Sequence, residues 1–155
     1  MKIEWSVAST SGTSINFTGV PSWAKRVTVM FTGVSTNSTS NLIIQLGSTT
    51  FTTSGYAGYV LRTGAASASY TAYSSGFLIT DTMAATYTMV GHLTITNITS
   101  NTWVGSGIST TTSGINNTNV TAGTIALAGA LDRVRITTVN GTDTFDAGSI
   151  NIMYE

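Results

Sequence analysis

The chain has 155 residues, of which 41% are hydrophobic and only 8% are charged, with a formal net charge of zero and no cysteine. Disordered chains are poor in apolar residues and rich in net charge, so this composition excludes disorder. The absence of cysteine excludes a disulfide framework and a cysteine-based metal site. A net charge of zero without a basic run argues against nucleic-acid binding.

The N-terminus and the apolar segments argue against a secreted or membrane-spanning chain. The start, MKIEWSVAST, lacks the apolar region of a signal peptide, and no apolar stretch approaches the ~18 residues that a membrane span needs. A chain of this length fits one domain, 1–155. Its commonest residue is threonine, whose branched Cβ favours strands, so the sequence predicts an all-β fold.

Alternation of apolar and polar residues with a period of two predicts most of the strands. In 26–34, Val27, Val29 and Phe31 share one face; in 87–98, Met89, Leu93 and Ile95 lie on the face predicted to be inside. In chain order, we expect strands at 2–7, 14–17, 26–34, 41–47, 58–62, 76–80, 87–98, 102–106, 123–128, 132–138 and 149–154.

Two segments depart from simple alternation. NLIIQLG (41–47) has apolar residues on both faces, which is typical of a central strand or of one buried between subunits. TAGTIALAGALDRV (121–134) resembles a helix in composition, but Gly123 and Gly129 interrupt it, so we expect a strand there.

Many short strands separated by clusters of glycine, asparagine and serine indicate an antiparallel β-sandwich of the jelly-roll type. Two low-complexity stretches, at about 48–75 and 105–122, are rich in serine, threonine, glycine, alanine and tyrosine. We expect these stretches to be long surface loops, where binding residues are often carried.

Three core segments carry a family resemblance. INFTGVPSWAKRVTVMFTGVSTNSTSNLIIQLG (15–47), GHLTITNITSNTWV (91–104) and LDRVRITTVNGTDTFDAGSINIMYE (131–155) resemble the C-terminal domain of tailed-bacteriophage tail fibre proteins. The most specific motif is FDAGSINIMYE, and the matches cover about half of the chain. The resemblance implies a trimeric β-sandwich at the distal end of a fibre, made in the host cytoplasm and assembled into the virion, where it contacts the host surface.

The scarcity of charge independently favours self-association. Twelve charged residues do not cover a monomer of this size in the usual way, and a net charge near zero promotes association. Met30, Ile43 and Val90 fall on faces opposite the predicted core, so we expect them to be buried between subunits. Three-fold symmetry follows from the fibre resemblance alone, since a dimer would also hide this surface.

These observations predict a non-enzymatic receptor-binding domain that recognises a bacterial surface glycan or outer-surface protein and assembles with itself and with other virion tail proteins. No cofactor is expected. One alternative is a structural virion protein, such as a head-fibre or decoration domain. Another is a capsule-polysaccharide depolymerase, which would need a pair of acids in a groove.

Five aromatic residues are candidates for receptor contact. Tyrosine combines a flat apolar face with a hydroxyl group at low entropic cost, which suits an adaptable recognition surface. The candidates are Trp23, in a loop beside two basic residues, and Tyr56, Tyr59, Tyr70 and Tyr73, in the first low-complexity stretch. The alternative is that the tyrosines pack this stretch onto their own subunit.

Four of the six acidic residues lie in the last 24 positions, which raises the possibility of a catalytic or metal site. Asn140-Gly141 is a strong turn signal, and Asp143 and Asp146 lie where such turns form. The favoured interpretation is turn and strand-edge chemistry. A calcium-type oxygen site at Asn140, Asp143 and Asp146 is the alternative, and catalysis is the least favoured.

His92 is the only histidine, so any Ser-His-Asp triad would have to use it. It lies in the middle of a predicted strand among threonines, and no G-x-S-x-G motif accompanies it. A histidine at a surface or a subunit contact is the favoured interpretation. A metal ring of three His92 copies on a trimer axis is an alternative.

Overall fold

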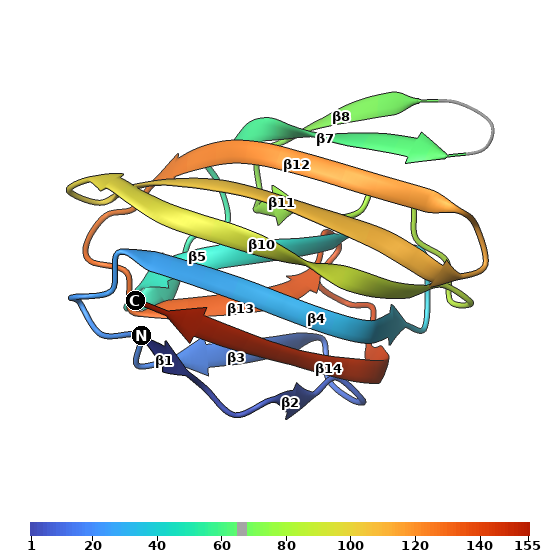
Figure 1. Ribbon diagram of the computed structural model, residues 1–155, viewed down its shortest axis with the longest axis horizontal. Helices are drawn as coiled ribbons and strands as arrows, with labels where there is room; N and C mark the ends of the chain where they lie inside the picture. The colour runs from blue at the N-terminus through green and yellow to red at the C-terminus, as the bar shows by residue number, and fades with distance from the viewer. Residues whose placement is uncertain (65–67) are drawn as a thin grey trace.

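The computed structural model describes residues 1–64 and 68–155. Over these ranges the chain forms two antiparallel sheets that pack as a sandwich (Figure 1). The predicted antiparallel β-sandwich is therefore confirmed, and 121–134 contains strands instead of a helix. The described residues contain no helix long and apolar enough to cross a membrane.

The larger sheet has the strand order β1-β14-β4-β10-β11-β12-β7-β8, and β2 also pairs with β14. Its strands are β1 (Lys2–Ile3), β2 (Val7–Ala8), β4 (Arg26–Thr36), β7 (Ala57–Gly64), β8 (Ser69–Tyr73), β10 (Thr88–Thr99), β11 (Thr102–Ser113), β12 (Asn117–Ala126) and β14 (Phe145–Tyr154). The two chain ends lie side by side at one edge of this sheet (Figure 1), because Lys2 pairs with Tyr154.

The smaller sheet has the order β3-β13-β5-β6, and β9 also pairs with β5. Its strands are β3 (Ser14–Thr18), β5 (Leu42–Ser48), β6 (Thr50–Phe51), β9 (Phe77–Leu78) and β13 (Arg133–Thr138). It lies behind the larger sheet in Figure 1.

The core lies between the two sheets and is built by the predicted alternation. Val29 of β4 pairs with Leu93 of β10, and Val27 pairs with Ile95, so their side chains share the inner face. All four are buried, as are Ile44 and Ile136, which pair in the smaller sheet. Fully burying each such side chain contributes about 1.5–3 kcal/mol, so this layer is the main source of stability.

Strand β5 is buried on both faces, as its composition indicated, but the segments that cover its outer face belong to the same chain. Ile43 pairs with Leu78 of β9 and is 1% exposed. The approach to β9 is so tight that a Cβ at Gly76 would lie 3.1 Å from the Ile43 Cβ. The expectation that Ile43 is buried between subunits is therefore wrong, whereas Met30 and Val90 are half-exposed.

The two low-complexity stretches are largely strands, which corrects the prediction of long loops at 48–75 and 105–122. The first contains β6, β7 and β8, and the second contains most of β11 and β12; residues 65–67 of the first lie outside the described residues. The expected alternation is hidden because small residues occupy inner positions. A Cβ at Gly58 or Gly123 would collide with the Tyr73 hydroxyl, and one at Gly105 would press on the Phe77 ring.

The FDAGS part of the C-terminal motif forms an irregular pairing between β14 and β4. The register shifts between Phe145 and Ala147 and again between Ala147 and Ser149. Gly148 has a φ of 93°, and a Cβ there would lie 2.5 Å from the Gly33 carbonyl carbon. Glycine is required at this bulge for both reasons, so the motif specifies local backbone geometry.

Candidate functional site

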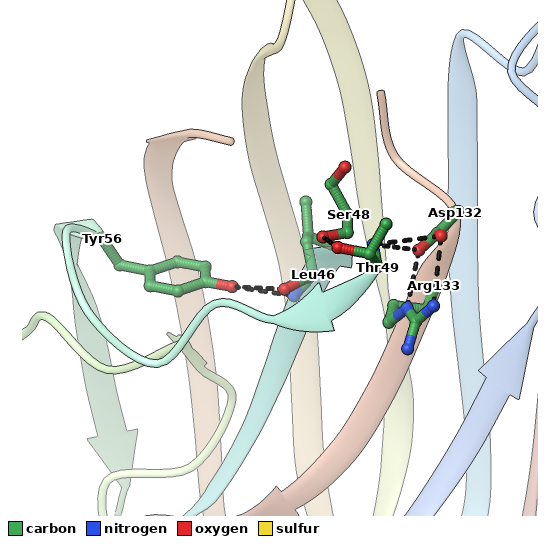
Figure 2. A network of polar contacts seen from close by, with 6 residues as sticks. All are labelled: Leu46, Ser48, Thr49, Tyr56, Asp132 and Arg133. Carbon is green, nitrogen blue, oxygen red and sulfur yellow. Dashed lines mark hydrogen bonds and ion pairs between the residues drawn. The ribbon is translucent and has the colours of Figure 1, made fainter. Parts of the chain in front are cut away.

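Two of the five predicted receptor residues belong to the core. Tyr56 is 3% exposed and Tyr73 is 9% exposed, and both rings pack edge-on against Phe77, with centroid distances of 5.2 and 6.3 Å. The Leu46 amide donates a hydrogen bond to the Tyr56 hydroxyl at 2.7 Å (Figure 2). Burial raises the pKa of Tyr56 to about 12. These two tyrosines fix the chain to its own core and are not available to a receptor.

The other three candidates are exposed. Tyr59 and Tyr70 are 58% and 75% exposed, and their rings meet edge to face at 6.1 Å on the β7–β8 hairpin, at the edge of the larger sheet (Figure 1). Trp23 is also exposed, and its ring lies 5.7 Å from that of Tyr154 in β14. Four strands separate β14 from β7 in the sheet, so Trp23 does not belong to the Tyr59–Tyr70 pair.

A row of mostly apolar side chains crosses the outer face of the larger sheet. Directly paired residues on six neighbouring strands form this open-face row: Met30, His92, Ile108, Val120, Leu61 and Tyr70. Ile108, Val120 and Leu61 are all more than 40% exposed. Sequence analysis missed Ile108 and Val120 because they lie in a stretch interpreted as a loop. Leu61 lies in the strand predicted at 58–62, but the sequence does not specify the strands with which it pairs.

His92 lies in the open-face row, exposed, between Met30 and Ile108. In the described part of the chain, its side chain makes no hydrogen bond to a carboxylate or to a serine. The surroundings therefore favour the surface or subunit-contact interpretation over a catalytic triad.

Asp132, the first of the C-terminal acids, has a structural role. The Arg133 guanidinium donates hydrogen bonds to both of its oxygens, at 2.6 and 3.1 Å, and the Thr49 amide donates to the same carboxylate (Figure 2). Hydrogen bonding from Arg133 holds the pKa of Asp132 below its usual range. Thr49 has a φ of 63°, so the carboxylate stabilises a left-handed turn between β5 and β6.

The calcium candidates serve as hydrogen-bond acceptors around a turn. The Asn140 side-chain oxygen accepts from the amides of Thr142 and Asp143, and Asp143 accepts from the Ser40 amide and the Asn140 side-chain amide. Asp146 instead accepts from the Ser35 hydroxyl. No group of three His, Cys, Asp or Glu residues in the described ranges could hold a metal ion. The geometry favours the turn interpretation.

The assignment of Tyr56 to the core predicts unequal effects of two matched substitutions. Tyr56→Phe leaves the buried Leu46 amide without its partner and should lower the free energy of unfolding by about 1–3 kcal/mol. Tyr59→Phe removes an exposed hydroxyl and should change it by less than about 0.5 kcal/mol. Urea denaturation measures both, and equal effects would contradict the assignment.

No family model, curated protein or solved structure matches this chain.

Proposed function

We propose that this chain is the receptor-binding domain of a bacteriophage tail fibre, a non-enzymatic adhesin that recognises a glycan or protein on the bacterial surface. The observation that carries the proposal is the exposed Tyr59–Tyr70 pair on the β7–β8 hairpin. It supplies two ring faces and two hydroxyl groups on a sheet framework. Rigid aromatic side chains provide contact area at a low cost in conformational entropy.

The open-face row supports self-association of the domain. Its central residues, Ile108 and Val120, are paired and exposed in the middle of the larger sheet, whereas Tyr70 lies at the end of the row on an edge strand. We assign the centre of the row to contacts between subunits of a homotrimer and the β7–β8 edge to the receptor. Exposed contiguous apolar surface of this kind is typical of protein contacts.

A trimer would raise the avidity of the domain for the cell surface. Three weak sites on one tip, and several tips on one virion, raise the overall avidity by about 10²–10⁴ without any tight single site. The domain would then act at the fibre tip of the virion, together with other tail proteins.

Binding of the purified domain to a panel of whole bacterial cells tests the adhesin function. The double substitution Tyr59→Ala, Tyr70→Ala should weaken binding at least about tenfold, because each truncation removes a central aromatic contact. Trp5→Ala is the matched control, since Trp5 is an exposed aromatic residue outside the hairpin, and it should bind as the wild type does. Unchanged binding of the double variant would reject the tyrosine site. If the wild type binds no host, the structural virion role is favoured.

Light scattering at micromolar concentration tests the trimer. The wild type should have a mass of about 48 kDa, three times the 16.1 kDa of one chain. Val120→Asp should release monomers, because a carboxylate buried at an interface without a partner costs several kcal/mol. Ile98→Asp introduces the same charge at an exposed position outside the row and should leave the mass unchanged. A stable 16 kDa wild-type species would contradict the trimer.

A further inference from the structure

The outer face of the smaller sheet contains a pocket of about 300 Å³, between β3, β5, β13 and the turn that follows β13. This volume lies at the lower end of the range of about 300–1,000 Å³ that small-molecule sites occupy. Serine and threonine make up most of its lining: Thr13, Ser14, Thr53, Ser75, Thr137 and Thr138. The hydroxyl groups of Thr137 and Thr138 already donate to the Thr13 carbonyl and to the Asn140 side-chain oxygen. The pocket is therefore suited to a small ligand that is rich in hydrogen-bonding groups.

Arg135 lines the pocket and is held in a defined orientation. Its Nε donates a hydrogen bond to the Gln45 side-chain oxygen at 2.6 Å, and its guanidinium carbon lies 4.4 Å from the centre of the Phe51 ring. Gln45 is only 3% exposed and is itself fixed, because its amide donates to the Ser75 carbonyl at 2.6 Å. Within the described residues no hydrogen bond engages Nη1 or Nη2, so this end of the guanidinium is available to a ligand.

Arg135 also differs from the other arginines in its charge balance. Arg26, Arg62 and Arg133 form ion pairs with Glu155, Asp81 and Asp132 respectively. Arg135 has no such carboxylate among the described residues, which include all six acids of the chain. A half-buried cation without a counter-ion is unfavourable, and an anionic ligand would supply the missing charge.

Arg133 provides an internal comparison, because it lies two residues away on the same face of β13. Hydrogen bonding with Asp132 raises the pKa of Arg133, whereas burial lowers the pKa of Arg135. The nearby Asn140 lines the pocket, but its neighbour Asp143 directs its oxygens to the Ser40 amide and the Asn140 amide. The pocket therefore presents one uncompensated positive charge surrounded by neutral hydroxyl groups.

We propose that this pocket binds the carboxylate of an acidic sugar, with Nη1 and Nη2 of Arg135 donating to the carboxylate and the surrounding hydroxyl groups bonding to the sugar. The planar guanidinium matches the geometry of a carboxylate, and a single positive charge suits a singly charged group. The site is separate from the Tyr59–Tyr70 pair and does not depend on the adhesin function. If the domain is an adhesin, the inference adds polysaccharides containing acidic sugars to its receptors.

Nuclear magnetic resonance titration of the isotope-labelled wild-type protein tests the site. Two probes differ only at the group of interest: methyl glucuronide has a carboxylate where methyl glucoside has a hydroxymethyl group. Methyl glucuronide should give saturable shifts confined to amides around the pocket, such as those of Ser14, Thr53 and Ser75. Methyl glucoside should bind at least about tenfold more weakly, since it lacks the charge-assisted hydrogen bonds.

Matched variants assign the effect to Arg135. Arg135→Gln should weaken glucuronide binding by about tenfold to a hundredfold, whereas Arg133→Gln should leave it unchanged because Arg133 is outside the pocket lining. Thermal unfolding checks that both variants fold. If Arg135→Gln does not fold, the location of the shifts in the wild type and the comparison of the two sugars test the proposal.

Several results would overturn the proposal. They are the absence of saturable shifts with methyl glucuronide, shifts located elsewhere, equal binding of the two sugars, or an equal loss of affinity in folded Arg133→Gln and Arg135→Gln. A control titration with sulfate separates a sugar site from a simple anion site. If sulfate binds as tightly as methyl glucuronide, the pocket is a simple anion site and the proposed sugar site is rejected.

Discussion

The rest of the structure depends on covering strand β5 on both faces. Its inner residues, Ile44 and Leu46, belong to the layer between the sheets, and its outer residues, Ile43 and Gln45, are also buried. Other parts of the chain satisfy the polar groups that this burial removes from water: the Thr80 hydroxyl accepts from the Leu42 amide, and the Tyr56 hydroxyl accepts from the Leu46 amide. An unpaired buried amide costs about 1–3 kcal/mol, so these contacts hold the connecting segments in place. The same cover fixes Gln45, which orients Arg135 at the edge of the covered region.

The sequence predicts a strand well where the strand itself supplies the apolar residues of its inner face, and poorly where other segments supply them. In β4 and β10 the inner residues are large and apolar, so alternation identified both strands and their inward faces within two residues of their observed ends. In β7, β11 and β12 the inner positions include Gly58, Gly105 and Gly123, because the side chains of Tyr73 and Phe77 fill the space above them. That complementarity is tertiary and weakens the periodic signal, so the strands predicted there, at 58–62, 102–106 and 123–128, are shorter than β7, β11 and β12. The burial of Ile43 was missed for a related reason: the strand at 76–80 was predicted, but local patterns do not show that it pairs with β5 across 35 positions.

The candidate sites show the same contrast: residues of one segment were identified from the sequence, whereas sites formed by several strands were missed. Sequence reasoning identified tyrosines as a group, but the structure separates the exposed pair on β7–β8 from the two that anchor the core. It interpreted the C-terminal acids as turn and strand-edge residues, and the hydrogen bonds of Asp132 and Asp143 stabilise turns. The open-face row and the Arg135 pocket were both missed, since each is assembled from residues of several strands whose pairing the sequence does not specify. With only six acids and six bases, the one arginine without an acid becomes informative only when every ion pair has been located.

Strand β5 and its cover form the rigid framework of the domain, and the β7–β8 edge is its adaptable part. Native-state hydrogen exchange, followed amide by amide, tests this division most directly. The amides of Leu42 to Leu46 should exchange only through global unfolding, because each strand neighbour and cover segment must leave before water reaches them. The amides of β8, at the edge of the larger sheet, should exchange by local opening at much lower free energy. Exchange of the β5 amides as fast as that of the β8 amides would contradict the account.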